Sequence, residues 1–124
     1  MTESTLPIVY LVDDDPAVRD SLRVILELYG MNVRDYASAR GFLADPDRGG
    51  PGCLVLDLHM PDMSGFELLE VLREQGSRLP VIVFSGRGDA TLREHVERNG
   101  AVAFLAKPVD TDILLETVKR FVLP

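Results

Sequence analysis

Residues 8–14 read Ile-Val-Tyr-Leu-Val-Asp-Asp, so five apolar residues stop abruptly at a pair of aspartates. Three further apolar runs also stop at a polar residue: 53–56 at Asp57, 81–84 at Ser85 and 102–106 at Lys107. Short continuous apolar runs are typical of strands buried on both faces of a parallel sheet. In open parallel sheets, ligands bind in the crevice outside the carboxyl ends of the strands. The four runs therefore predict one polar site at one edge of a sheet.

Between these runs the apolar residues recur at helical spacing, and glycines or prolines mark the ends of the segments. The predicted helices run from Pro16 to Tyr29, from about Ser38 to Pro46, around Phe66 to Leu72, from Asp89 to Asn99 and from Thr111 to Val122. Residues 32–36 form a weaker strand candidate. On the first helix, five apolar side chains are expected to face inward: Val18, Leu22, Ile25, Leu26 and Tyr29.

Strand and helix thus alternate five times, without internal sequence repeats or linkers. Parallel neighbours need right-handed crossovers, so helices must cover both faces of the sheet. The sequence predicts one α/β domain over residues 1–124, with a core of about 8–122. Its expected architecture is a flavodoxin-like, doubly wound (βα)5 three-layer sandwich with parallel strand order 2-1-3-4-5.

Composition excludes several classes of protein. The 124 residues carry 13 basic and 20 acidic side chains, a net charge of −7, and −4 remains when Asp13, Asp14 and Asp57 are left out. Because a phosphate backbone needs neutralising cations, direct nucleic-acid binding is not expected. The single Cys53 excludes an internal disulfide. No apolar stretch reaches the length of a membrane span, so a cytoplasmic protein without membrane contact is expected.

The predicted site has the ingredients of phosphoryl chemistry. Three carboxylates that lie close together cannot all ionise at low cost unless a cation sits among them. A cluster of hard oxygen ligands suits Mg²⁺, and an Asp carboxylate can act as a nucleophile toward phosphorus. Lys107 supplies a second cation, and the Ser85 hydroxyl can donate to a phosphoryl oxygen.

Four motifs together resemble the receiver domain of two-component response regulators, closest to the FixJ and NarL type. They are Val12-Asp13-Asp14-Asp15, the segment Leu56-Asp57-Leu58-His59-Met60-Pro61-Asp62-Met63-Ser64-Gly65, Phe84-Ser85-Gly86, and Phe104-Leu105-Ala106-Lys107-Pro108. The resemblance covers about residues 8–122. It implies a phosphorylation-activated switch with Mg²⁺ as cofactor and a sensor histidine kinase as partner. It implies no enzymatic activity other than the phosphorylation and dephosphorylation of the domain itself.

The resemblance also assigns roles around the phospho-acceptor. Asp57 would accept the phosphoryl group from a phosphohistidine and contribute to the metal site. Asp14 would ligate Mg²⁺ directly and Asp13 mainly through water. The backbone carbonyl of His59 would complete the protein ligands, while its side chain is expected to project into solvent.

Further expectations concern the response to phosphorylation. Ser85 would move toward the phosphoryl group and Phe104 would turn inward, although a plain core role for Phe104 stays open. The Lys107–Pro108 peptide bond is expected to be cis. His59 and Arg87, two residues after Asp57 and Ser85, would border the path of attacking water.

Two other functions fit the sequence less well. A phosphatase of the haloacid dehalogenase type wants Val or Thr at the fifth position of its motif, where this chain has Ala17. A flavodoxin needs a phosphate loop rich in Ser, Thr and Gly, and the aspartates after the first strand would repel a flavin phosphate.

The output of the domain is left open by the sequence. The chain is either a stand-alone receiver that acts by protein contact or as a phosphate sink, or part of a transcription regulator with a C-terminal DNA-binding domain. The helix from Asp89 to Asn99 carries only Leu92 and Val96 as large apolar residues and is expected to be the least firmly held. A monomer or a weak phosphorylation-dependent dimer is expected.

Overall fold

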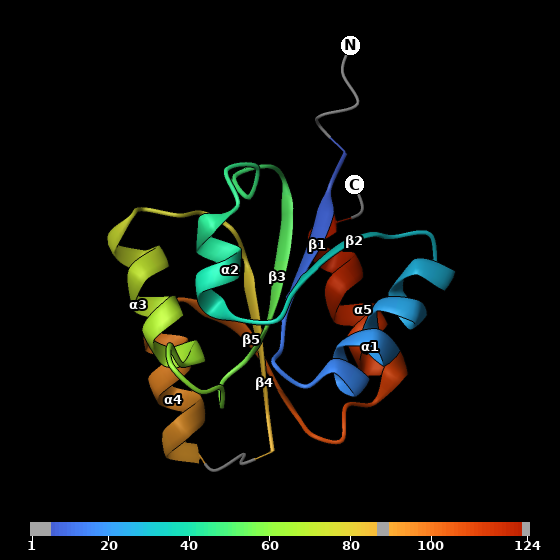
Figure 1. The fold of residues 1–124 in the computed structure, drawn as a ribbon. Helices are drawn as coiled ribbons and strands as arrows, with labels where there is room; N and C mark the ends of the chain where they lie inside the picture. Colours follow the sequence, from blue (N-terminus) through green and yellow to red (C-terminus); the bar gives the residue numbers. More distant parts are fainter. Residues whose placement is uncertain (1–5, 87–89, 123–124) are drawn as a thin grey trace.

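The computed structural model describes residues 6–86 and 90–122 and contains one parallel sheet with helices on both faces (Figure 1). The strands are β1 Ile8–Val12, β2 Asn32–Tyr36, β3 Gly52–Asp57, β4 Val81–Ser85 and β5 Ala101–Ala106. The helices are α1 Pro16–Leu28, α2 Ala39–Ala44, α3 Gly65–Glu74, α4 Ala90–Arg98 and α5 Thr111–Val122. The strand order is β2-β1-β3-β4-β5, which confirms the predicted doubly wound sandwich.

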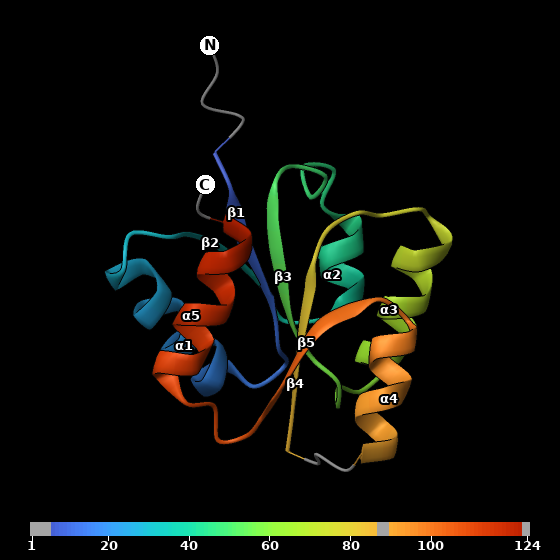
Figure 2. The same cartoon turned by 180° about the vertical axis from the view of Figure 1, so that it is seen from behind.

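Two apolar cores lie on opposite faces of the sheet. Helices α1 and α5 cover one face, and α2, α3 and α4 cover the other (Figures 1 and 2). Alternate residues of β1 point to different faces, so Val9 and Leu11 pack toward α1 and α5, while Tyr10 and Val12 pack in the other core. Burial on both faces explains why the central strands are continuously apolar.

Local capping signals fix where the helices begin. The Asp15 carboxylate accepts hydrogen bonds from the backbone N–H groups of Ala17 and Val18, and Pro16 occupies the first turn of α1. At the start of α3, Ser64 and Glu67 form a reciprocal capping box. These capping contacts explain why α1 begins at Pro16 and α3 at Gly65.

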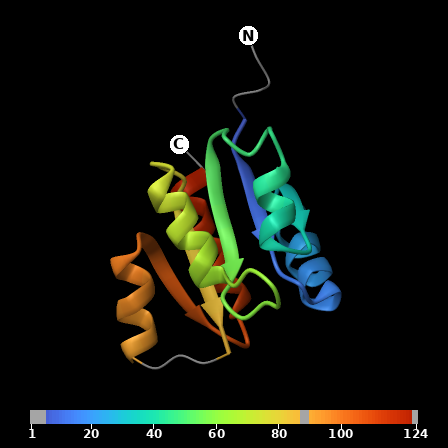
Figure 3. The same ribbon diagram turned by 60° about the vertical axis from the view of Figure 1, so that its left-hand side comes forward.

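The strand register brings the polar residues to one end of the sheet. Val12 is level with Leu56, so Asp13 follows β1 just where Asp57 ends β3. Asp57 in turn is level with Phe84, one residue before Ser85 at the end of β4. Figure 3 shows the strands converging on this end of the sheet, beside the loop that leads into α3.

Two predictions about burial were wrong. Tyr29 caps α1 instead of facing inward and is 58% exposed, and its ring lies 5.7 Å from the Lys119 ammonium. Val102 is 49% exposed, because β5 is an edge strand and its outer positions are only partly covered. Apolar continuity alone does not distinguish an edge strand from a central one.

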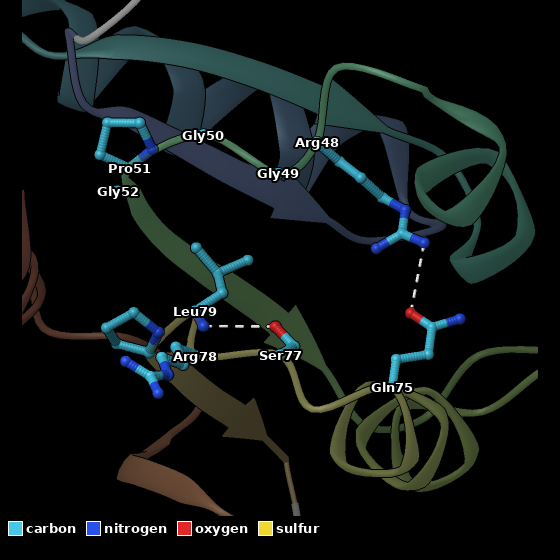
Figure 4. A pocket seen from close by; sticks show the side chains of 10 residues that line it. Arg48, Gly49, Gly50, Pro51, Gly52, Gln75, Ser77, Arg78 and Leu79 are labelled. Carbon is cyan, nitrogen blue, oxygen red and sulfur yellow. Dashed lines mark hydrogen bonds between the residues drawn. The ribbon is translucent and has the colours of Figure 1, made fainter.

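The opposite end of the sheet carries a separate hollow of about 410 Å³ (Figure 4). It lies between the loop from Arg48 to Gly52 and the loop from Gln75 to Pro80, where an Arg48 N–H donates to the Gln75 side-chain oxygen at 3.3 Å. Gly52 has a φ of +138°, and a Cβ there would lie 1.8 Å from the Ile8 carbonyl oxygen. This glycine is thus explained by the close approach of β1 to β3.

Candidate functional site

Three carboxylates form a compact cluster where β1 and β3 end. Asp13, Asp14 and Asp57 each offer a carboxylate oxygen, and these oxygens lie within 4.8 Å of one another. Asp13 and Asp57 are buried, whereas Asp14 is exposed. The structure therefore brings together the three acidic residues that the sequence predicted to meet.

The buried Asp13 carboxylate is only partly satisfied by hydrogen bonds. Its Oδ1 accepts a hydrogen bond from the Asp15 backbone N–H at 2.9 Å, while its buried Oδ2 has no hydrogen-bond partner among the described residues. Burial, with a smaller contribution from the neighbouring Asp57 charge, raises the pKa of Asp13 from 3.8 to about 6. An ionised carboxylate with an unsatisfied buried oxygen fits a site built to receive a cation.

Asp57 lies opposite the ammonium group of Lys107. The Lys107 Nζ is 3.4 Å from Asp57 Oδ1, and the Asp57 side chain is 4% exposed. The backbone N–H of His59 donates to the same carboxylate oxygen at 3.2 Å. Lys107 is held in place because its backbone N–H donates to the Ser85 carbonyl at 2.8 Å and its ammonium lies 4.9 Å from the centre of the Phe84 ring. As predicted, the Lys107–Pro108 bond is cis.

The His59 side chain contacts Ser85. His59 is exposed, as expected, but its Nε2 also lies 2.9 Å from the Ser85 Oγ, at hydrogen-bonding distance, so the ring reaches the end of β4. Ser85 is fully buried. The contact with Ser85 was not predicted, because residue spacing does not reveal that the loop after β3 turns the ring toward the neighbouring strand.

Phe104 lies in the core between the sheet and α4. It is 8% exposed, and the Arg93 guanidinium on α4 lies over its ring at 5.3 Å from the ring centre. This position is that of a core residue capped by a cation. A switching role for Phe104 stays a prediction.

The loop between β3 and α3 is shaped by two residues with special backbone requirements. Asp62 has a positive φ of 66°, and its carboxylate pairs with Arg40 of α2. A Cβ on Gly65 would lie 2.5 Å from the Asp57 carbonyl oxygen and 2.7 Å from the Leu58 Cα. Only glycine allows α3 to begin this close to the backbone of the acceptor strand.

Arg19 supports the acidic loop and was missed at the sequence level. Its guanidinium donates to the Asp13 backbone carbonyl at 2.8 Å and to an Asp35 carboxylate oxygen at 3.0 Å. Arg19 thereby ties the end of β1 to β2. An exposed-looking arginine on a helix gives no signal of such a contact, because the partner is a backbone atom.

Two residues named from the sequence, Arg87 and Asp89, lie outside the described residues. Within the described ranges, no helix is long and apolar enough to cross a lipid bilayer. His95 packs edge-on against Phe66 at 5.2 Å between ring centres.

Fold and site together define a doubly wound α/β domain with an acidic pocket, a lysine and a hydroxyl at the carboxyl ends of its central strands. The response regulator receiver domain family model matches residues 9–119. The chain belongs to this family.

Individual relatives support the assignment. The chain is 42% identical over 114 residues to the transcriptional regulatory protein FixJ of Azorhizobium caulinodans, which covers 90% of this chain and 53% of that protein. It is 43% identical over 112 residues to the C4-dicarboxylate transport transcriptional regulatory protein DctD of Pseudomonas aeruginosa, covering 90% of this chain and 24% of that protein. The chain thus spans about half or less of the length of these relatives.

Solved structures agree on the fold. A structure described as FixJ-N superposes with a TM-score of 0.83 at 40% identity and covers 98% of this chain and 95% of that one. The response regulator StyR superposes with a TM-score of 0.87 at 36% identity, covering 94% of this chain and 59% of that one. The resemblance to the FixJ type, first argued from four motifs, is confirmed.

Proposed function

We propose that Asp57 accepts a phosphoryl group from the phosphohistidine of a sensor histidine kinase, with Mg²⁺ bound in the acidic cluster. The observation that carries this proposal is the pairing of Asp57 with Lys107 at 3.4 Å inside a cluster of three carboxylates. In this reading, residues 1–124 form one receiver domain that acts in the cytoplasm and catalyses only its own phosphorylation and dephosphorylation.

The residues present support an in-line transfer. An Asp57 carboxylate oxygen forms the new bond to phosphorus, and the bond from phosphorus to the donor nitrogen breaks. Charge in the transition state is spread over the three equatorial oxygens, so fixed cations and hydrogen-bond donors near them are what the protein must supply. Lys107 supplies a point charge, and the Ser85 hydroxyl supplies a hydrogen-bond donor.

The donor set fits Mg²⁺ better than a softer metal. Asp14 and Asp57 would ligate the ion, the His59 backbone carbonyl would complete the protein ligands, and Asp13 would act mainly through water. The raised pKa of Asp13 and its unpartnered Oδ2 are relieved by a cation at this place. When bound, Mg²⁺ neutralises phosphoryl oxygens and orients the phosphoryl group for attack.

Transcriptional output is the further part of the proposal. The relatives above are transcription regulators about twice as long as this chain or longer. We infer that phosphorylation shifts the face formed by residues 89–122, to which α4, β5 and α5 belong, and thereby controls a DNA-binding domain. No direct contact between this domain and nucleic acid or membrane is expected. A stand-alone receiver that acts through protein contacts is the alternative, and a monomer or weak phosphorylation-dependent dimer is expected.

The acceptor is tested by phosphorylation with acetyl phosphate and Mg²⁺, followed by intact-protein mass spectrometry and peptide mapping. Asp57→Asn should abolish labelling, because the amide cannot attack phosphorus. Asp62→Asn is the matched control: Asp62 lies in the same loop and is exposed, and asparagine tolerates its positive φ equally well. Full labelling of the Asp57→Asn protein would refute the assignment.

A further inference from the structure

The backbone of Asp13 is held on both sides at the point where the chain leaves β1. Its N–H donates to the Tyr36 carbonyl of β2 at 3.2 Å. Its carbonyl accepts a hydrogen bond at 2.8 Å from the guanidinium of Arg19, which lies in the first turn of α1. A backbone carbonyl that is removed from water needs such a partner. Arg19 therefore gives the end of β1 a bond that the sheet no longer supplies there.

The guanidinium of Arg19 is itself anchored to β2. Its Nε donates to Asp35 Oδ2 at 3.0 Å, and the two side chains are only 17% and 18% exposed. A guanidinium is planar and presents its donors in a rigid fork, so simultaneous contacts with Asp13 and Asp35 fix its orientation. Arg23, one turn further along α1, pairs with the other oxygen of Asp35 at 2.7 Å. In the described part of the chain Arg23 has no contact with Asp13, so of the two arginines Arg19 connects β2 with the acidic loop.

The carboxylates of Asp13 and Asp14 depend on this loop for their positions. Asp13 Oδ1 accepts a hydrogen bond from the Asp15 N–H at 2.9 Å, and Oδ2 is left for a cation. The exposed Asp14 side chain has no hydrogen-bond or ion-pair partner among residues 6–86 and 90–122, so only the backbone on either side places it. After Asp14, that backbone is fixed because Asp15 caps α1; before it, Arg19 holds Asp13. Groups that orient metal ligands in this way contribute strongly to metal affinity.

We propose that Arg19 is a positioning residue of the Mg²⁺ site. By bridging the Asp13 carbonyl and Asp35, it holds the loop after β1 so that Asp13 and Asp14 present their carboxylates to the ion. Charge alone would have the opposite effect, because a positive group near a cation site weakens cation binding. The charge of Arg19 is paired with Asp35, so this repulsion is reduced and the orienting effect dominates. The inference rests on the proposed function and concerns the metal affinity of the same site.

The test measures the Mg²⁺ dissociation constant of the intact chain by NMR titration, together with the unfolding free energy in EDTA. Arg19→Met removes the charge and all donors, and its dissociation constant should rise about tenfold, the lower end of the range for groups that orient metal ligands. Arg19→Lys keeps the charge but cannot form the same forked pair of bonds, so its dissociation constant should rise as well. A dissociation constant equal to or below that of the original chain, in either variant that folds, would overturn the inference.

Arg23→Met is the matched control. It removes the same charge and the other ion pair of Asp35 from the next turn of α1. Its Mg²⁺ dissociation constant should change much less than that of Arg19→Met, and an equal rise would count against a specific role for Arg19. A purely structural role would lower the unfolding free energy of Arg19→Met in EDTA and leave its Mg²⁺ dissociation constant unchanged, which would also overturn the inference.

A double-mutant cycle shows whether Asp35 acts through Arg19. Asp35→Ala should raise the Mg²⁺ dissociation constant in the original chain. In the Arg19→Met background it should have little further effect, because the guanidinium that Asp35 anchors is gone. A rise of the same size in both backgrounds would refute the bridge between Asp35 and the acidic loop.

The proposed function is separated from this inference by Asp14→Asn. If the original chain does not bind Mg²⁺, or if Asp14→Asn binds it equally well, the proposed metal site is wrong. If the original chain binds Mg²⁺ and Asp14→Asn binds it weakly, while Arg19→Met keeps full affinity, only the role of Arg19 is refuted.

Discussion

Asp13 should destabilise the metal-free fold at neutral pH, and Asp13→Asn should therefore stabilise it. Burial raises the pKa of this carboxyl from 3.8 to about 6. The difference of about two between these pKa values corresponds to about 3 kcal/mol of unfavourable free energy when the group is ionised. Asparagine keeps an oxygen for the Asp15 N–H and removes the buried charge, so a gain of about 1–3 kcal/mol is expected.

The pH dependence has a definite sign. Between about pH 4 and pH 6 the folded state binds the Asp13 proton more tightly than the unfolded state does. The contribution of Asp13 to the unfolding free energy therefore falls as pH rises through this window, and its full cost is present at pH 7. Asp13→Asn should remove this decline, so the two proteins should differ most at neutral pH and converge near pH 4.

The assay is urea unfolding in EDTA, followed by circular dichroism at several pH values. Asp14→Asn is the matched control: its carboxylate belongs to the same cluster but is exposed, so its neutralisation should change the metal-free stability by less than Asp13→Asn does. Mg²⁺ should stabilise the original chain, by about 2.7 kcal/mol at one hundred times its dissociation constant, and stabilise Asp14→Asn much less. An Asp13→Asn protein that is less stable than the original at pH 7 without metal would refute the reasoning.

Three further outcomes are expected. Lys107→Ala should leave Mg²⁺ affinity largely intact but weaken the binding of beryllofluoride, a mimic of the phosphoryl group. Asp14→Asn should weaken the binding of both ligands. Calorimetry that showed an equal loss of Mg²⁺ affinity in the two variants would contradict this division of roles. Gly65→Ala should lower the unfolding free energy by about 2 kcal/mol or more, because its Cβ would lie 2.5 Å from the Asp57 carbonyl oxygen. Gly49→Ala should leave the free energy from urea unfolding nearly unchanged, because a Cβ there would have no atom within 4 Å. Amide exchange should be faster in α4 than in α1, because the described part of α4 has one buried large apolar residue, Val96, whereas α1 has two, Leu22 and Leu26. Slow exchange throughout α4 would contradict this prediction.

The sequence predicted those parts of the fold in which the residues of one segment are sufficient to identify it, such as a continuous apolar run that ends at a polar residue. The central strands are apolar because helices cover both faces, and their polar ends mark the site. The cluster of Asp13, Asp14 and Asp57 followed from strand order alone, since adjacent parallel strands end together.

The features that escaped prediction depend on where a side chain turns after leaving its element. The His59 ring folds back onto Ser85, and Arg19 reaches a backbone carbonyl that has no signature in the sequence. Tyr29 falls on the helical stripe but lies beyond the last turn of α1, where nothing covers its ring completely. These are tertiary contacts of long side chains, and periodicity does not specify them.

The magnitudes also constrain how such a domain can switch. Moving a two-state equilibrium from 1:99 to 99:1 needs about 5.5 kcal/mol of differential binding. One hydrogen bond from the Ser85 hydroxyl to a charged phosphoryl oxygen would contribute about 1.5–3 kcal/mol. The remainder has to come from other groups that respond to the same phosphoryl charge, and among the described residues Lys107 is placed for this, 3.4 Å from the acceptor. For a shift of this size we therefore expect Ser85 and Lys107 to act together, so that Ser85→Ala alone should weaken the response to phosphorylation without abolishing it.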